Sequence, residues 1–267
     1  MAVRIEKSGP VCTVIHSRPD ARNAMDPASA DALVRAFEFF DADPTAYVAV
    51  LWGEGGAFCA GWDLKYAASL EGDRPLASLD FPTDGSKPPR GPLGPTRLEL
   101  SKPVIAAVEG PAVAGGMELA LWCDLRVMAE SAYIGVYCRR WGIPLIDGGT
   151  VRLPRLVGQG RALDIILTGR KVTAEECYRI GACERLAPHG RAREVAEQLA
   201  HEIARFPQAC VRSDRMSVYR QHGLPVRKAL ETEWQTSTGI VTAAEGISGA
   251  GRFIAGKGRH GDYADIH

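Results

Sequence analysis

The segment SKPVIAAVEGPAVAGGMELALWCDLRVMAE, residues 101–130, constrains the fold more than any other part of the chain. Within it, Val104–Val108 is a short apolar run of the length typical of a buried strand. The small-residue turn GPAVAGG follows, MELALW begins a helix, and Leu125–Ala129 has the composition of another strand. A strand, a turn, a helix and a second strand at this spacing predict a right-handed βαβ unit.

The residues before this segment alternate in the same way, and those after Gly148 are predicted to be helical. Val11–Ile15 and Tyr47–Trp52 are strand candidates. Pro27–Asp41 has apolar residues at helical spacing, with Asp26 as its expected cap. The later helices are predicted at 160–168, 173–180, 191–206, 207–221 and 226–244. We therefore expect an α/β core over residues 1–190 and a helical C-terminal region over residues 191–267.

Residues 66–100 differ in character from the rest of the core. Between Leu70 and Pro95 the chain contains six prolines, at positions 75, 82, 88, 89, 92 and 95, and shows little periodicity. Unstructured segments of this length in compact domains are often lids or disordered loops. We predict a long Pro-rich insertion that folds as a loop or lid.

Composition and charge exclude several classes of function. Lys and Arg together number 32, as do Asp and Glu, so the net charge is zero and gives no basis for binding nucleic acid or an anionic membrane. No apolar run approaches the ~20 residues of a membrane span, and the N-terminus lacks the pattern of a leader. The seven scattered cysteines favour free thiols in a reducing cytoplasm. The six histidines show no metal-ligand spacing, so we predict no metal site.

Two turns made of small residues are the first candidates for a functional site. FCAGWDL (58–64) follows one predicted strand, and AVAGGMELAL (112–121) follows another and opens a helix. Small residues let a ligand approach the backbone closely, and amides at a helix N-terminus favour negative charge. Two such turns on neighbouring strands could direct two N–H groups at one carbonyl oxygen, as in an oxyanion hole. The alternative is that both are merely tight turns.

Taken together, these motifs resemble the crotonase family, the enoyl-CoA hydratases and isomerases. The resemblance covers nearly the whole chain apart from residues 66–100. It includes RPDARNAMD (18–26), AFCAGWDL (57–64), residues 101–130, GGTVRLPRLVG (148–158) and LTGRKVTAEECYRIGACERL (167–186). It implies an α/β fold, a crotonase-like spiral of ββα units whose helical C-terminal region drives trimer formation, with two trimers often stacking as a hexamer. It also implies an acyl-CoA thioester as substrate, with coenzyme A part of that substrate and no metal or redox cofactor.

The resemblance assigns catalytic roles to particular positions. The backbone N–H groups of Trp62 and Gly115 would hold the thioester oxygen, and Glu118 would be the first catalytic carboxylate. A glutamate in the first turn of a helix also interacts favourably with the helix dipole, which is the structural alternative for Glu118.

The resemblance also implies a binding site for the coenzyme A part of the substrate. Ala60, Asp63 and Leu64 would line a groove for it through their main chain. Arg22 and Lys65 would lie near its phosphates, and Lys257 would reach the coenzyme A of a neighbouring subunit.

The second catalytic carboxylate of the familiar hydratases is absent from its usual position. Cys138 stands there, three residues after Gly135. Arg139 and Arg140 could lower the pKa of its thiol, although a buried structural cysteine is the commoner case. Asp147 is the nearest replacement, and its alternative role is that of an ordinary N-cap for the helix that follows.

Three functions remain open at this point. The first is an enoyl-CoA hydratase in which Glu118 and Asp147 divide the work of activating water and delivering a proton. The second is an isomerase or another CoA-ester lyase, which needs only a carboxylate that removes and returns a proton. The third is a family member that binds acyl-CoA without turnover.

Overall fold

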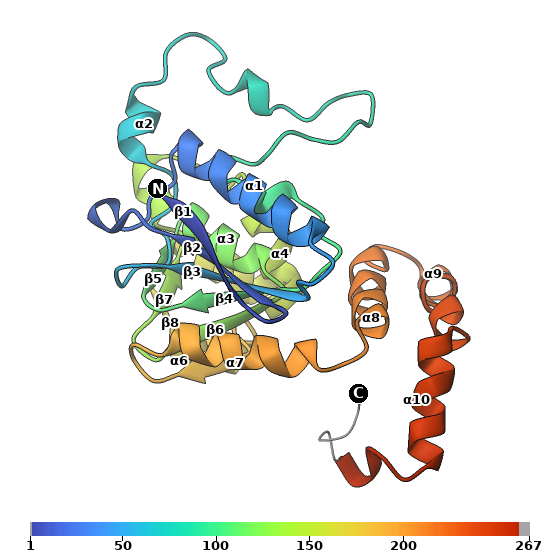
Figure 1. Ribbon diagram of the computed structural model, residues 1–267. Coiled ribbons are helices and arrows are strands. Elements are labelled where there is room, and N and C mark those ends of the chain that lie inside the picture. The colour runs from blue at the N-terminus through green and yellow to red at the C-terminus, as the bar shows by residue number, and fades with distance from the viewer. Residues whose placement is uncertain (1, 262–267) are drawn as a thin grey trace.

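A six-stranded sheet forms the centre of the molecule (Figure 1). The computed structural model describes residues 2–261, so residues 1 and 262–267 of the two predicted regions lie outside the described part. The strands of the sheet are β1 (Val3–Ser8), β2 (Val11–His16), β3 (Val48–Gly53), β4 (Val104–Val108), β6 (Leu125–Ala129) and β9 (Arg185–Ala187). Their order is β1-β2-β3-β4-β6-β9, and only the β1–β2 pair is antiparallel.

A smaller sheet lies beside the large one and consists of β5 (Pro111–Val113), β7 (Tyr133–Gly135) and β8 (Val172–Thr173). Only Glu109 and Gly110 separate β4 from β5. A Cβ atom on Gly110 would lie 2.0 Å from the carbonyl oxygen of Gly56, in the turn after β3. The absence of a side chain at Gly110 therefore lets the turns after β3 and β4 touch.

Two long helices cover the large sheet. In α1 (Pro27–Ala42), Phe37 and Phe40 are fully buried, and Asp26 caps the helix by accepting a hydrogen bond from the Ser29 N–H at 2.8 Å. In α7 (Ala192–Ala204), small side chains four residues apart form one buried face that lies against β2, β3, β4 and β6. These are Ala192, Ala196, Ala200 and Ala204.

Shorter helices complete the core. They are α2 (Leu64–Ala68), α3 (Gly115–Trp122), α4 (Gly149–Val157), α5 (Gln159–Thr168) and α6 (Ala174–Ile180). Short 3-10 turns lie at Pro19–Ala21, Ala77–Leu79, Pro95–Arg97, Tyr137–Trp141 and Arg259–Gly261. Every residue of α3 is buried, and all except Glu118 are glycine or apolar, as expected of a helix enclosed by other elements. α3 contacts both β5 and β6, and so links the two sheets.

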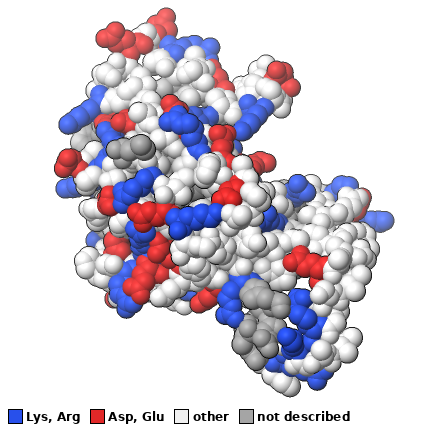
Figure 2. Space-filling model, in the orientation of Figure 1, with Lys and Arg blue, Asp and Glu red and all other residues white. Residues whose placement is uncertain are grey.

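Three helices extend away from the core at the C-terminal end (Figure 1). They are α8 (Gln208–Arg220), α9 (Val226–Val241) and α10 (Ala244–Ile254), each of which contacts the next. Large apolar side chains are exposed along α9 and α10, namely Val226, Leu230, Trp234, Val241, Ile247, Phe253 and Ile254. Figure 2 shows acidic and basic side chains interspersed over the core, whereas much of the visible surface of the C-terminal part is uncharged.

The predicted βαβ unit is confirmed in its two strands and its topology. β4 and β6 have the predicted bounds and pair in parallel, and α3 joins them but begins at Gly115, two residues before the predicted start. The predicted helix 226–244 is wrong at its end, because α9 stops at Val241 and α10 follows. Three glycines within α10 (246, 249 and 251) oppose helix formation, so the sequence gives little sign of this helix.

The Pro-rich insertion is only partly the loop that the sequence predicts. Figure 1 shows it looping out over α1 between α2 and the return to the core. Its last residues are buried, however, including Leu93, Pro95 and Thr96. The insertion therefore ends inside the molecule, beside α3 and α1. No helix within residues 2–261 is long and apolar enough to cross a membrane.

The packing of α1 can be tested with two phenylalanines on the same helix. Phe37 is fully buried and contacts Trp122 edge-on, with ring centroids 4.9 Å apart, whereas Phe39 is 63% exposed. Phe37→Ala should lower the free energy of unfolding by about 3–5 kcal/mol, because it removes a core ring and leaves a cavity. Phe39→Ala should change it by less than about 0.5 kcal/mol. Urea unfolding followed by circular dichroism measures both, and equal midpoints for the two variants would contradict this account of the core.

Candidate active site

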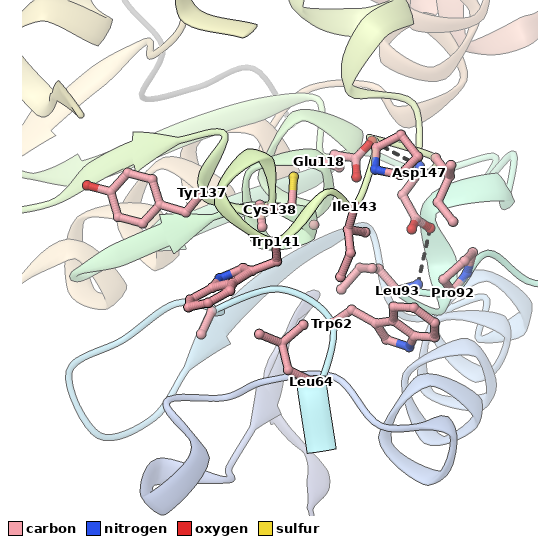
Figure 3. Close-up of a pocket in the computed structure, with 15 residues that line it drawn as sticks. Trp62, Leu64, Pro92, Leu93, Glu118, Tyr137, Cys138, Trp141, Ile143 and Asp147 are labelled. Atoms are coloured by element: carbon pink, nitrogen blue, oxygen red, sulfur yellow. Dashed lines mark hydrogen bonds between the residues drawn. The ribbon is translucent and has the colours of Figure 1, made fainter. Parts of the chain in front are cut away.

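One pocket brings together all four catalytic residues that the sequence predicts (Figure 3). It lies where the turns after β3 and β5 meet the end of the Pro-rich insertion and the segment between β7 and α4. Its lining is mostly apolar apart from two carboxyl groups. The lining residues are Ala60, Trp62, Leu64, Pro92, Leu93, Ala114, Gly115, Glu118, Tyr137, Cys138, Trp141, Ile143, Pro144, Ile146 and Asp147.

The turns that carry Trp62 and Gly115 are in direct backbone contact. Cys59 forms a parallel bridge with Ala112, and the Val113 N–H donates to the Cys59 carbonyl at 3.0 Å. Gly61 has a φ of +93°, and a Cβ atom there would lie 3.0 Å from the Gly115 nitrogen. Glycine at position 61 thus permits both the left-handed conformation and the close approach of the two turns.

The amides of Trp62 and Gly115 have no acceptor among residues 2–261. Gly115 is the first residue of α3, so its N–H cannot take part in the hydrogen bonds of that helix. Ala114, immediately before it, has a φ of +54°, a region that side-chain-bearing residues rarely adopt. Such strain often occurs at functional sites, where the surrounding structure holds it in place. Two N–H groups on adjoining turns are therefore available to a ligand in the pocket.

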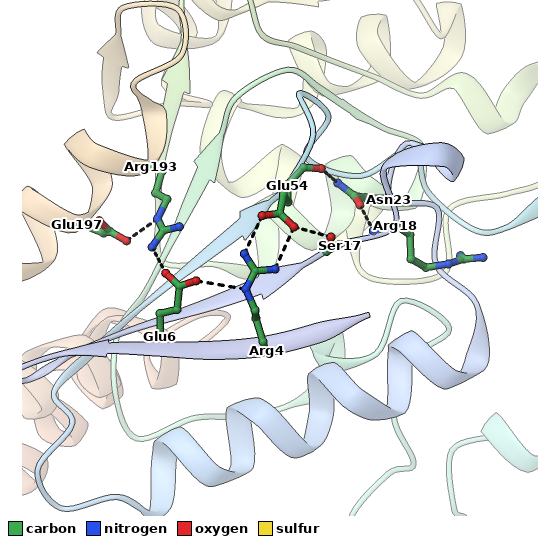
Figure 4. A network of polar contacts seen from close by, with 8 residues as sticks. All are labelled: Arg4, Glu6, Ser17, Arg18, Asn23, Glu54, Arg193 and Glu197. Atoms are coloured by element: carbon green, nitrogen blue, oxygen red, sulfur yellow. Dashed lines mark hydrogen bonds and ion pairs between the residues drawn. The ribbon is translucent and has the colours of Figure 1, made fainter. Parts of the chain in front are cut away.

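A polar network fixes the turn that carries Trp62 (Figure 4). The side-chain amide of the buried Asn23 donates to the carbonyls of Glu54 and Ala57 at 2.8 and 2.7 Å. Its oxygen accepts the Arg18 N–H at 2.7 Å, and the Arg18 guanidinium pairs with Asp63 at 3.0 Å. The segment 18–26 therefore connects both ends of the turn 54–63. Arg18 and Asn23 belong to the motif RPDARNAMD, but no role for either is predicted from the sequence.

Glu118 lies in the first turn of α3 and is 2% exposed. Its Oε1 accepts the N–H groups of Asp147 and Gly149 at 2.9 and 2.8 Å. Burial raises the pKa of Glu118 to about 7, against the opposing effect of the Gly149 amide and together with the charge of Asp147. At neutral pH the carboxyl group can therefore both accept and release a proton.

Asp147 is not the N-cap of the helix that follows it, so that alternative is wrong. The N-cap position of α4 is Gly148, and no side chain caps the helix. Asp147 is 3% exposed, and its Oδ1 instead accepts the Leu93 N–H at 3.1 Å and the Thr96 hydroxyl at 2.5 Å. Its Oδ2 accepts no hydrogen bond from the described residues. Burial raises the pKa of Asp147, although the hydrogen bonds from Thr96 and Leu93 oppose this rise.

Cys138 lines the pocket as a buried thiol. It lies in the 3-10 turn Tyr137–Trp141, and burial raises its pKa, as does the charge of Glu118. Neither following arginine is directed at its sulfur, since Arg139 Nε donates to the Ile166 carbonyl and Arg140 lies over the Tyr137 ring. The alternative in which these arginines lower the pKa of the Cys138 thiol and make it a thiolate is therefore wrong.

The residues predicted to bind coenzyme A are distributed around the pocket. Ala60 and Leu64 line it, whereas the Asp63 side chain caps α2 by accepting the Lys65 N–H at 3.0 Å. The predicted cations Arg22, Lys65 and Lys257 are exposed and lie outside the lining. Their role in binding coenzyme A stays a prediction.

Sequence reasoning missed much of the wall opposite the two amides. Trp141 is 66% exposed and lines the pocket, in a place that no motif of the sequence indicated. The sequence gives little indication of this wall, since its apolar and aromatic residues recur at neither helical nor strand spacing. The residues missed are Pro92, Leu93, Tyr137, Ile143, Pro144 and Ile146, with Thr96 and Arg152 behind them. Within residues 2–261 no group of three or more His, Cys, Asp or Glu side chains is placed to hold a metal ion.

Comparison with known proteins identifies the fold and the family. The sequence model described as enoyl-CoA hydratase/isomerase matches residues 6–254. An enoyl-CoA hydratase of Mycobacterium tuberculosis is 34% identical over 256 residues, covering 93% of this chain and 92% of the relative. A carnitinyl-CoA dehydratase of Salmonella arizonae is 40% identical over 204 residues, or 74% of each chain.

The solved structures agree with the sequence relatives. The crystal structure of an enoyl-CoA hydratase from Mycobacterium marinum superposes with a TM-score of 0.86 at 31% identity, covering 96% of both chains. The α/β crotonase-like fold predicted from the sequence is thereby confirmed. By its sequence and by its fold, this chain belongs to the enoyl-CoA hydratase/isomerase family.

Proposed function

We propose that this protein adds water across the 2,3 double bond of an acyl-CoA thioester, and catalyses the reverse dehydration. The observation that carries the proposal is the placement of two buried carboxyl groups, Glu118 and Asp147, in one pocket with the two free amides of Trp62 and Gly115. The names of the relatives, an enoyl-CoA hydratase and a carnitinyl-CoA dehydratase, support addition or removal of water on a CoA ester.

The two amides would act as an oxyanion hole. As water attacks C3 of the substrate, the electron pair of the double bond moves toward the thioester carbonyl and its oxygen gains negative charge. The N–H groups of Trp62 and Gly115 would stabilise that oxygen in the enolate. Because their turns are fixed by backbone contacts, little reorganisation would be needed when the charge develops.

The two carboxyl groups would handle the water and its protons. Glu118 would take a proton from water as the oxygen bonds to C3, and would then return it to C2 as the enolate collapses. The product is a 3-hydroxyacyl thioester, and Glu118 regains its starting charge. Oδ2 of Asp147 would accept the other hydrogen of the water and orient its lone pair toward C3, since this oxygen has no partner among the described residues.

The coenzyme A part of the substrate would lie along the main chain of Ala60, Asp63 and Leu64. The exposed side chains of Arg22 and Lys65 are free to contact its phosphates, and Lys257 would do so from a neighbouring subunit. The exposed apolar side chains of α9 and α10 support assembly of the C-terminal helices into a homotrimer or homohexamer, because burying them would stabilise the assembly.

Isomerisation of an enoyl-CoA double bond is the second candidate. The observation in its favour is Cys138, whose raised pKa keeps a neutral thiol where the familiar hydratases have a second acid. Moving a double bond requires only that one carboxylate removes a proton and returns it at another carbon, which Glu118 alone could do.

Substrate assays separate the two reactions. The purified protein should convert crotonyl-CoA to a product heavier by one water, detected by mass spectrometry. A 3-enoyl-CoA incubated in parallel should stay unchanged. If the 3-enoyl-CoA were converted without a change in mass and crotonyl-CoA did not react, the result would contradict hydration and support isomerisation. Binding of acyl-CoA without any product would contradict both reactions.

Substitution of each carboxyl group tests its role. Glu118→Gln and Asp147→Asn keep the size of the side chains but remove the charge, and each should lower kcat for hydration by about 10²-fold or more. Cys138→Ala, which removes no carboxyl group, should leave kcat close to that of the unmodified protein. Unchanged kinetics for Asp147→Asn would show that Asp147 takes no part in the reaction.

The pH dependence of hydration should follow the ionisation of Glu118. Its carboxylate must be ionised to accept a proton from water, so kcat/KM should rise with pH up to the pKa of about 7 and level off above it. Because the charge of Asp147 contributes to this raised pKa, Asp147→Asn should move the acidic limb to lower pH. If the acidic limb of the unmodified protein instead lay near the ordinary pKa of a glutamate, this would argue against Glu118 as the base.

A further inference from the structure

The end of the Pro-rich insertion closes directly on the carboxyl group of Asp147. Gly91 and Gly94 exchange backbone hydrogen bonds of 3.0 and 2.9 Å and so form a tight turn. A Cβ atom on Gly91 would lie 2.1 Å from Thr96 Oγ1 and 2.4 Å from Asp147 Oδ1. Glycine at position 91 thus lets the turn lie against the hydrogen bond between Thr96 and Asp147.

The hydrogen bonds to Asp147 are all on one side of its carboxyl group. Thr96 and the Leu93 N–H both donate to Oδ1, and both come from the end of the insertion. Oδ2 is buried and accepts nothing from the described residues. Buried carboxyl oxygens usually have partners, and leaving one without a partner is costly. Asp147 lines the pocket, so Oδ2 is the carboxyl oxygen left without a partner at the pocket wall.

Arg152 joins the two segments that meet at this carboxyl group. From α4, its Nη1 donates to the Asp147 carbonyl at 2.9 Å and its Nη2 donates to the Thr96 carbonyl at 2.7 Å. A guanidinium group is planar and rigid, so two such bonds fix the distance and the angle between the segments. Thr96 and Asp147 are far apart in the sequence, and Arg152 holds their backbones together.

We propose that Thr96 and Arg152 are positioning residues that direct Oδ2 of Asp147 toward the reacting water, so that the end of the insertion is part of the catalytic machinery. The inference rests on the proposed hydration. Thr96 sets the orientation of the carboxyl group, and Arg152 sets the position of the backbone that carries it. Neither residue touches the substrate.

The charged and titratable groups around Asp147 determine how removal of the Thr96 hydroxyl will act. Glu118 faces it from α3, Arg152 from α4, Arg97 from the end of the insertion, and Cys59 from the turn after β3. The hydrogen bond from Thr96 lowers the pKa of Asp147, so its loss raises that pKa further. As the solution is acidified, Asp147 would then become protonated at a higher pH than in the unmodified protein.

The test compares Thr96→Val, which keeps the shape but removes the hydroxyl, with Thr96→Ser, which keeps the hydroxyl. Thr96→Val should lower kcat for crotonyl-CoA hydration by about tenfold or more, the scale of one hydrogen bond to a charged group, with little change in KM. Protonation of Asp147 should add to the fall in activity at acidic pH and begin at a higher pH than in the unmodified protein, and Thr96→Ser should restore both properties. Thr83→Val, on the exposed part of the same insertion, is the matched control and should change neither.

A double substitution distinguishes positioning from a general effect on the fold. In the Asp147→Asn background, Thr96→Val should cause little further loss of kcat, because the two residues act through one group. If Thr96→Val does not fold, Arg152→Lys takes its place as the test. This substitution keeps the charge but loses the two-point contact, and it should lower kcat in the same way.

Three outcomes would overturn the inference. Unchanged kcat and pH profile in Thr96→Val would exclude positioning by Thr96. A full tenfold further loss in the Asp147→Asn background would show that Thr96 acts elsewhere. If Asp147→Asn itself left kcat unchanged, this would contradict the role of Asp147 in the proposed function, and the inference about positioning would fail with it.

Discussion

The close contact between two backbone turns is the constraint on which the rest of the site depends. The parallel pairing of β3 with β4 brings the carboxyl ends of both strands to one edge of the sheet, and the bridge between Cys59 and Ala112 continues that pairing. A Cβ atom on Gly116 would lie 2.0 Å from the Cys59 carbonyl oxygen, so a side chain there would push the turns apart. The separation of the Trp62 and Gly115 amides is therefore set by the backbone. Later elements of the pocket are placed around this pair.

The two carboxyl groups show how burial and backbone amides oppose each other. The amides at the start of α4 favour a charge on Glu118, as helix N-termini generally do. Removal from water disfavours the charge, and its pKa of about 7 shows that burial is the larger effect. A lysine in place of these amides would have held the carboxylate ionised. Partners without a full charge leave Glu118 able to change its protonation state near neutral pH, which proton transfer requires.

The sequence predicts what depends on local patterns and misses what depends on distant contacts. β4, β6 and the Asp26 cap were predicted correctly, because an apolar run or a cap residue is sufficient to indicate each. Strands as short as β5, β7 and β8 show no period, and they form only because partner strands lie beside them. The place of Glu118 in the first turn of α3 followed from the glycine turn. The partners of Asp147 did not, since Thr96 lies on an insertion whose prolines indicated only a loop.

The position of the second acid and the fold of the insertion are linked by physical necessity. An acid at position 138 would lie on the 3-10 turn Tyr137–Trp141, whereas Asp147 lies just before α4, where its side chain turns away from the helix N-terminus. A buried carboxyl group that makes no use of those amides needs other donors. In this chain the donors come from Leu93 and Thr96, so the tight turn that begins at Gly91 must close on the core rather than remain a loop. A substitution that breaks the contact of this turn with Asp147 would leave its carboxyl group buried without hydrogen-bond donors, which favours the neutral form. The acid at 147 can therefore act as a carboxylate only while the end of the insertion is folded against it.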